Sequence, residues 1–150
     1  MKIRQGFVSN SSSSSFVVIG NENPSFAYFD KYKDQYITLG LDGETEFGWD
    51  NVKYSGVDTR INFAYLQTSC GENKEWLQLL ENTIMNYTGA TSIDWRLTEE
   101  WDTNKGYVHG YIDHQSHTGE GKNTEIFENE EVLTRFLFSN DSYIQGGNDN

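Results

Sequence analysis

The sequence predicts an α+β fold, in which a mostly antiparallel β-sheet carries two helices packed on one face. Short apolar segments alternate with turn residues along most of the chain, and two further segments have helical spacing. Their order is several strands, a helix, two strands, a helix and a short final strand. At 150 residues, with 35% hydrophobic residues, the chain fits a single domain over residues 1–150 that can bury a core.

The first half of the chain contains mainly predicted strands. Phe16–Ile19 is an uninterrupted run of β-branched and aromatic residues, which is typical of a strand. Tyr36–Leu39 and Thr45–Trp49 flank Asp42-Gly43, so we expect these two segments to form a hairpin. The segment 61–67 (INFAYLQ) is predicted as another strand.

The clearest helix signal lies in residues 69–89, where apolar side chains recur at spacings of three and four. Ser69 and Asn73 are both suitable N-caps, and Gly89 suits the end of the helix. The apolar positions are Trp76, Leu77, Leu80, Ile84 and Tyr87.

The last third of the chain predicts a hairpin, a helix and an edge strand. Segments 91–97 and 107–114 have strand character and are separated by a polar loop, so we expect them to pair antiparallel. A second helix begins near Asn129. We expect residues 142–145 to form a short edge strand before the polar tail, 146–150.

The net charge is −12, and it is concentrated in the second half of the chain. Residues 1–74 hold 7 basic and 9 acidic side chains, whereas residues 75–150 hold 4 and 14. Such a surface repels phosphate backbones, which argues against direct binding of nucleic acid. It attracts basic surfaces, including those that normally hold nucleic acid. Solubility is the simpler explanation of the same charge.

Composition also predicts where the protein is found. No apolar run approaches the length of a membrane span, and the N-terminus lacks the apolar region of a secretory signal. Cys70 is the single cysteine, so no internal disulfide can form, which fits a reducing compartment. We therefore expect a cytoplasmic protein that does not associate with membranes. No motif calls for a cofactor.

A serine-rich segment, residues 9–15, lies between Val8 and the apolar run that begins at Phe16. Its composition is typical of a connector. Ser11, Ser12 and Ser13 are also suited to phosphorylation or to an anion-binding turn of backbone N–H groups. No Gly-Lys-Ser/Thr follows, so the segment is not a P-loop. The sequence leaves these interpretations open.

Residues 4–16, RQGFVSNSSSSSF, resemble the start of a scattered group of uncharacterised small proteins from phages and phage-bearing bacteria. Residues 111–116 (YIDHQS) and the ending at 136–150 are similar, more weakly, to segments of the same group. The resemblance implies a phage or prophage origin, with action on host machinery in the infected cell. It implies no particular activity.

An Asp–His pair is the best chemical candidate in the sequence. In the expected hairpin of 91–97 with 107–114, Asp94 lies near His114, and Asp113 is adjacent. A carboxylate beside an imidazole raises the pKa of the imidazole and fixes the imidazole's tautomer, as a general base requires. Cys70, placed at the start of a helix, would be a less favoured thiolate nucleophile. No spacing of ligands matches a known metal site.

Aromatic and acidic residues in the second half suggest a surface for a basic protein. We expect Trp101 to be exposed at the hairpin tip, and acidic residues at the second helix start to extend the same surface. The leading hypothesis is a small phage-type accessory protein that inhibits or redirects a basic, nucleic-acid-handling host protein. The alternatives are a small hydrolase or nucleotide-processing enzyme using Asp94, Asp113 and His114, and a virion or assembly component. The acidic residues of the expected surface are Glu99, Glu100, Asp102, Glu128, Glu130 and Glu131.

Overall fold

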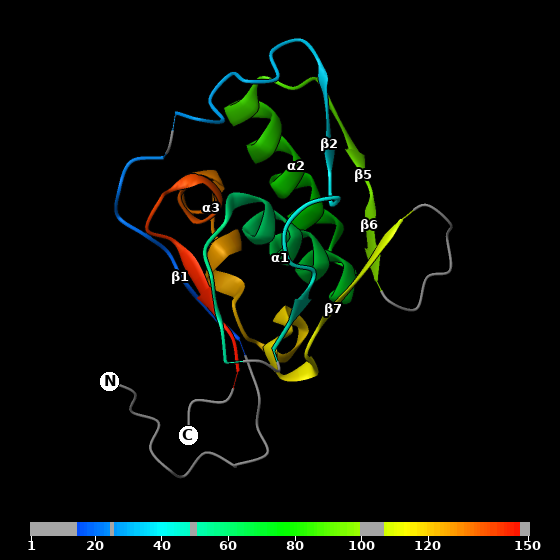
Figure 1. Cartoon of the computed structure of the whole chain (residues 1–150). Helices are drawn as coiled ribbons and strands as arrows, with labels where there is room; N and C mark the ends of the chain where they lie inside the picture. Colours follow the sequence, from blue (N-terminus) through cyan, green and yellow to red (C-terminus); the bar gives the residue numbers. More distant parts are fainter. Residues whose placement is uncertain (1–14, 25, 49–50, 100–106, 148–150) are drawn as a thin grey trace.

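Three helices lie between two groups of strands (Figure 1). The structure is a computed structural model, and it describes residues 15–24, 26–48, 51–99 and 107–147. The helices are α1 (Val57–Cys70), α2 (Lys74–Thr88) and α3 (Glu130–Phe138). Three short 3-10 helices, η1 (His114–Ser116), η2 (Thr118–Glu120) and η3 (Thr124–Phe127), connect the last long strand to α3.

The strands on one side of the helices form an antiparallel sheet in the order β1-β8-β4. The strands on the other side form two parallel groups, β2-β5 and β3-β7-β6. The strands are β1 (Phe16–Val18), β2 (Tyr36–Leu39), β3 (Glu46–Phe47), β4 (Lys53–Tyr54), β5 (Ser92–Trp95), β6 (Leu97–Glu99), β7 (Val108–Ile112) and β8 (Tyr143–Gln145).

The fold is therefore a mixed α+β fold, which confirms the predicted class, but the prediction of a mostly antiparallel sheet is wrong. β2 pairs in parallel with β5, and β6 pairs in parallel with β7, so neither expected hairpin forms. The described residues also include three α-helices where the sequence predicted two. β8 pairs with β1 on one edge and β4 on the other, so it is a central strand and not the expected edge strand.

The missing helix is α1, which occupies the segment predicted as a strand at 61–67. Nearly every position from Thr59 to Thr68 is buried, whichever way it faces, and the helix therefore lacks an exposed side. A helix buried on all sides shows no 3.6-residue alternation of apolar and polar residues. The spacing that identifies surface helices was consequently absent from this segment.

Of the two N-caps predicted for α2 the second is confirmed, and the helix expected near Asn129 begins there. Asn73 accepts a hydrogen bond from the backbone N–H of Trp76, at 2.9 Å, so Asn73 and not Ser69 is the N-cap of α2. Gly89 ends α2 at a φ of +82°, a conformation that favours glycine. Asn129 caps α3 by accepting from the N–H of Val132, at 2.9 Å.

A chain of aromatic rings in the core connects the strands to the helices. The Phe47 ring of β3 lies edge-on to Phe63 of α1, with centroids 5.1 Å apart, and Phe63 lies 6.3 Å from Phe136 of α3. All three side chains are almost completely buried. Edge-to-face contacts of this kind add to the stability gained from burial alone.

Arg60 is the largest fully buried side chain, with 2% of its surface exposed. Its Nη1 donates to the carbonyl oxygens of Phe136 and Ser139, at 2.9 and 2.5 Å, at the C-terminal end of α3. Burial lowers the pKa of Arg60 to about 10. The guanidinium therefore joins α1 to α3 and places a positive charge at the negative end of the α3 dipole.

Only Arg96 separates β5 from β6, and at this residue the extended segment changes partner. The Arg96 N–H donates to the carbonyl of Leu39 at the end of β2, at 2.7 Å, and the Arg96 carbonyl accepts from the N–H of Val108 at the start of β7, at 2.7 Å. One continuous stretch of chain thus joins the two parallel groups of strands.

Candidate functional site

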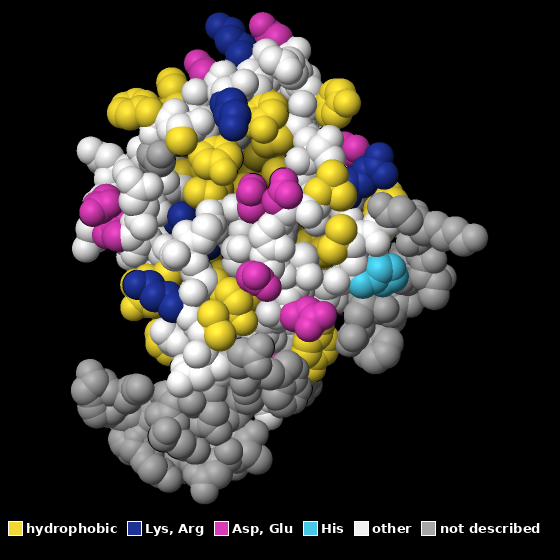
Figure 2. All heavy atoms as spheres, viewed as in Figure 1, with side chains coloured by type: hydrophobic (Ala, Val, Ile, Leu, Met, Phe, Trp, Pro, Cys, Tyr) yellow, Lys and Arg dark blue, Asp and Glu magenta, His cyan; other side chains and the backbone are white. Residues whose placement is uncertain are grey.

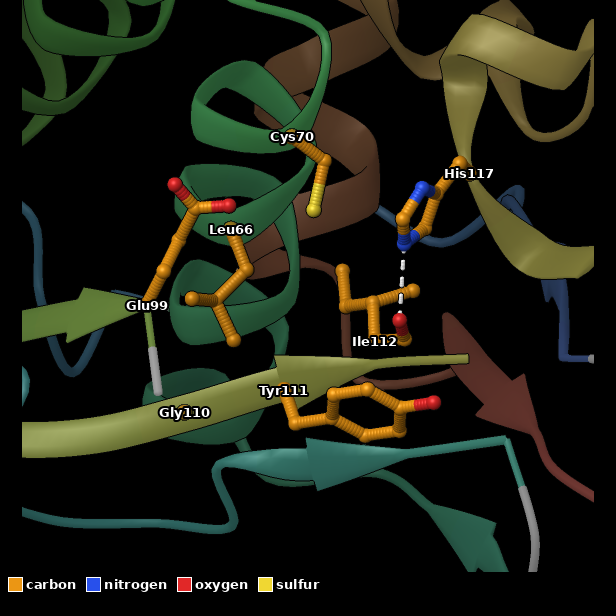
Figure 3. Close-up of a pocket in the computed structure, with 7 residues that line it drawn as sticks. All are labelled: Leu66, Cys70, Glu99, Gly110, Tyr111, Ile112 and His117. Atoms are coloured by element: carbon orange, nitrogen blue, oxygen red, sulfur yellow. Dashed lines mark hydrogen bonds between the residues drawn. The ribbon is translucent and has the colours of Figure 1, made fainter. Parts of the chain in front are cut away.

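A small pocket lies between the C-terminal end of α1 and strands β6 and β7 (Figure 3). Its volume is about 50 Å³, which is enough for little more than one water molecule. Three of its side chains carry chemistry: Cys70 from α1, Glu99 from β6 and His117, which precedes η2. In Figure 3 the Cys70 sulfur projects between the side chains of Glu99 and His117. The remaining lining residues are Leu66, Gly110, Tyr111 and Ile112.

The surroundings of Cys70 keep its thiol protonated. Burial and the charge of the neighbouring Glu99 raise the pKa of Cys70 to about 12. Cys70 is the last residue of α1, so the expected position at a helix N-terminus is wrong. The C-terminal end of a helix carries partial negative charge, which disfavours a thiolate as well. The position therefore suits an inert thiol and not the predicted nucleophile.

His117 is held in one tautomer by the backbone. Its Nε2 lies 2.7 Å from the carbonyl oxygen of Ile112, and a carbonyl can only accept, so Nε2 carries the proton. The pattern of residues did not indicate this position of His117, because its nearness to Cys70 depends on α1 being a helix. No three His, Cys, Asp or Glu side chains gather as a metal site requires within the part of the chain that the structure describes.

The predicted pairing of Asp94 with His114 depended on the antiparallel hairpin, which the structure does not form. Asp94 lies on β5 opposite Thr38 of β2, and its carboxylate pairs with the Arg96 guanidinium at 3.1 Å. His114 begins η1, which Asp113 separates from β7. The strand carrying Asp94 and the strand preceding His114 therefore have different partners.

Asp113 is 1% exposed, and its contacts hold the local fold together. Its backbone N–H donates to the carbonyl of Phe47, at 2.9 Å. In the amide orientation that satisfies both groups, the Gln115 nitrogen donates to the two Asp113 carboxylate oxygens, at 2.9 and 3.1 Å. A Cβ at Gly48 would lie only 2.1 Å from the Asp113 Cβ, so this approach requires glycine.

A buried polar cluster, which the sequence did not indicate, surrounds Ser15. The Ser15 N–H donates to Ser116 Oγ at 2.5 Å, and Asn123 Nδ2 donates to the Ser15 carbonyl at 3.1 Å. Gln67 of α1 donates to the Ser116 carbonyl and accepts from the Thr118 N–H. These five side chains are all at least nine-tenths buried. The end of the serine-rich segment is thus fixed to η1 and the residues that follow.

Internal partners engage several acidic residues of the second half. Glu81 accepts from Trp95 Nε1 at 2.8 Å, and Glu99 lines the pocket instead of standing on an exposed hairpin tip. Asp141 accepts from the backbone N–H groups of Asn21 and Glu22. On the face in Figure 2, acidic side chains lie among apolar and basic ones. The expected surface is therefore smaller than the charge count suggested.

An exposed acidic strip nevertheless runs from the start of α2 to the start of α3. Trp76 of α2 stacks on Phe127 of η3, with centroids 4.6 Å apart, and so packs the start of α2 against η3. Asn86 of α2 donates to Glu130, at 3.1 Å, and so fixes the first turn of α3 beside α2. The acidic strip consists of the exposed residues Glu72, Glu75, Glu125, Glu128, Glu130 and Glu131.

Several predicted residues lie outside the described part of the chain. They are Ser11, Ser12 and Ser13 of the serine-rich segment, together with Glu100, Trp101 and Asp102. No helix among the described residues is both long and apolar enough to cross a membrane.

Comparisons of the chain with family models, with curated proteins and with solved structures found no match.

Proposed function

We propose that this protein binds a basic protein surface through the acidic strip, and that its natural partner is a nucleic-acid-handling protein of the host. The observation that carries the proposal is that the acidic strip is exposed on elements packed against one another, α2 on η3 by the Trp76–Phe127 stack and α2 on α3 by the Asn86–Glu130 hydrogen bond. Carboxylates held on a fixed framework suit a partner that normally receives phosphates. The resemblance of residues 4–16 to phage-associated proteins supports a host target.

The charge balance around the acidic strip favours the same function. Lys74, Lys122 and Arg135 are the basic residues beside it in the sequence, and Arg135 lies 3.9 Å from Glu131. A pair at this distance contributes little, so Glu131 remains available to a partner. Six carboxylates against three basic groups leave the strip anionic.

The test is a pull-down from a nuclease-treated bacterial lysate with a strip variant, in which Glu75, Glu125, Glu128 and Glu131 are all replaced by Gln. We expect the variant to bind the captured protein roughly tenfold more weakly, because four exposed charges contribute about 0.4 kcal/mol each. Binding of the unmodified protein should weaken as salt rises, and duplex DNA or RNA should displace the captured protein.

The matched control changes four exposed acidic residues on other elements, and so changes the net charge by the same amount. It carries Glu22→Gln, Asp34→Asn, Glu44→Gln and Glu46→Gln. The control should retain binding. Equal loss in both variants, capture that is insensitive to salt, or the absence of any captured basic protein would each contradict the proposal.

A further inference from the structure

A groove of about 310 Å³ lies between Pro24 and the first two turns of α3. Ligand sites in proteins begin at about 300 Å³, so the groove can hold one long side chain but not a folded element of a partner. Two of its residues, Glu130 and Glu131, belong to the acidic strip, so the groove forms the α3 end of that surface. The other lining residues are Thr134 and Arg135.

Hydrogen bonds hold the loop wall of this groove against α3. Arg135 Nη1 donates to the carbonyl of Asn21, at 3.2 Å, and the Ser139 hydroxyl donates to the carbonyl of Glu22, at 2.8 Å. Pro24 then makes an isolated bridge to Ser139. The groove is therefore formed before a partner arrives, which avoids the entropic cost of ordering its walls on binding.

The two glutamates of the groove differ in how far internal partners engage them. Asn86 Nδ2 donates to both carboxylate oxygens of Glu130, at 3.3 and 3.1 Å, and so fixes that negative charge in place. The Glu131 side chain is 80% exposed, and among the described residues its only partner is Arg135 Nε, 3.9 Å away. This distance is too long for a hydrogen bond, so both oxygens of Glu131 are free to accept from a ligand.

Charge and shape in the groove favour a long cationic side chain. The carboxylates of Glu130 and Glu131 outnumber the single guanidinium of Arg135, which already donates to a loop carbonyl. Pro24 adds apolar surface on which methylene groups can pack. Arginine combines methylenes with a planar fork of donors, which binds a carboxylate through two parallel hydrogen bonds, so it matches the groove better than lysine.

We propose that the groove between Pro24 and α3 takes an arginine side chain of the basic partner, with its guanidinium on Glu131 and its methylenes against Pro24. The inference rests on the proposed function, and it names the side chain that the partner supplies and the point at which the acidic strip receives it. The other carboxylates of the strip attract the partner at long range, whereas the groove recognises one residue of the partner by shape and hydrogen bonding.

The probe is N-acetylarginine methylamide, titrated into the full, isotope-labelled chain while the backbone amide resonances are recorded. We expect saturable shifts, with a dissociation constant in the millimolar range, centred on Glu131 and Thr134. N-acetylcitrulline methylamide has nearly the same shape but no charge, so it should bind roughly tenfold more weakly. N-acetylaspartate methylamide, an anion, should not shift these resonances.

Two variants separate the groove from the charge of the strip. Thr134→Trp fills the groove without changing the net charge, and it should weaken binding of the arginine probe roughly tenfold. Glu131→Gln removes the free carboxylate with little change of shape, and it should weaken binding roughly threefold. The matched control is Gln78→Trp, at an exposed position on α2, which should bind the probe as the unmodified chain does. The amide spectrum of each variant shows that it is folded.

The inference is overturned if the citrulline or aspartate compound binds as tightly as the arginine compound. It is also overturned if Glu131→Gln leaves the affinity unchanged, or if a folded Thr134→Trp variant does. In the pull-down, full binding of the captured protein by Thr134→Trp, together with loss of binding by the strip variant, would exclude the groove and leave the proposed function standing. Retained binding by the strip variant would contradict the function itself.

Discussion

Replacing Arg60 by methionine is expected to lower the free energy of unfolding by about 2–4 kcal/mol, because two hydrogen bonds from a charged donor are lost. The carbonyls of Phe136 and Ser139, at the end of α3, would remain buried without these partners. Methionine preserves most of the side-chain volume, so the loss reports the hydrogen bonds more than a cavity. Urea denaturation at neutral pH measures the change.

Two further variants make the Arg60 result specific. Arg60→Lys keeps the charge but not the planar fork of donors, and it should be intermediate in stability. Arg135→Met removes a half-buried arginine whose ion pair with Glu131 is long and whose hydrogen bond to the Asn21 carbonyl is exposed, so it should cost only about 1 kcal/mol. If Arg60→Met were as stable as Arg135→Met, the buried guanidinium would have no role in holding α3 to α1.

Cys70 is expected to react with iodoacetamide at pH 8 roughly a thousandfold more slowly in the folded protein than in the unfolded chain. The reason is that burial and Glu99 raise the thiol pKa from 9.0 to about 12, and only the thiolate reacts. Mass spectrometry of the alkylated protein over time, with and without denaturant, measures both rates. Equal rates would show that the pocket does not protect the thiol.

The contribution of Glu99 can be separated from that of burial. Glu99→Gln removes the negative charge beside the sulfur, so the thiol pKa should fall and alkylation of the folded protein should accelerate. Glu75→Gln, which removes an exposed carboxylate at the start of α2, should leave the rate unchanged. An effect of the same size in both variants would contradict a local role for Glu99.

The same pKa shift predicts a pH dependence of stability. A thiol whose pKa is raised in the folded state stabilises the fold below pH 9, and this stability is lost as the pH rises toward 12. Between pH 8 and pH 11, Cys70→Ala should therefore lose less stability than the unmodified protein. Denaturant titrations of both proteins at these two pH values make the comparison, and parallel losses would contradict it.

The elements that the sequence predicted correctly are those with a local signal. α2 and α3 have apolar spacing, an asparagine N-cap and, in α2, a terminal glycine. β2 was predicted at its observed bounds because Tyr36–Leu39 is a run of strand-forming residues between polar ones. α1 gave no such signal, since its burial on all sides removes the contrast between faces.

Strand pairing could not be predicted in the same way, because partners lie far apart in the chain. Tyr36 of β2 pairs opposite Ser92 of β5, and nothing in either short segment specifies the other. The expected hairpins came from turn residues such as Asp42-Gly43, which do form a bend but do not join two paired strands. Tertiary packing on α1 and α2 overrides such local preferences.

The candidate site was correspondingly difficult to predict. Cys70 and Glu99 were both singled out, but for separate roles, one as a nucleophile and the other as a surface charge. Cys70 and Glu99 lie near His117 because α1 is a helix and β6 pairs in parallel with β7, whereas the sequence predicted a strand and a hairpin. A site assembled by misassigned elements cannot be recovered from residue types alone.

The junction at Arg96 makes the length of this extended segment critical. Successive side chains of a strand face opposite ways, so one added or deleted residue there would turn Leu97, now 1% exposed, toward water while leaving β5 in place. The number of residues in β5, Arg96 and β6 therefore fixes the register of one parallel group of strands relative to the other. Loops tolerate insertions, but this extended stretch does not, because its length sets which side chains face the core on both sides of Arg96.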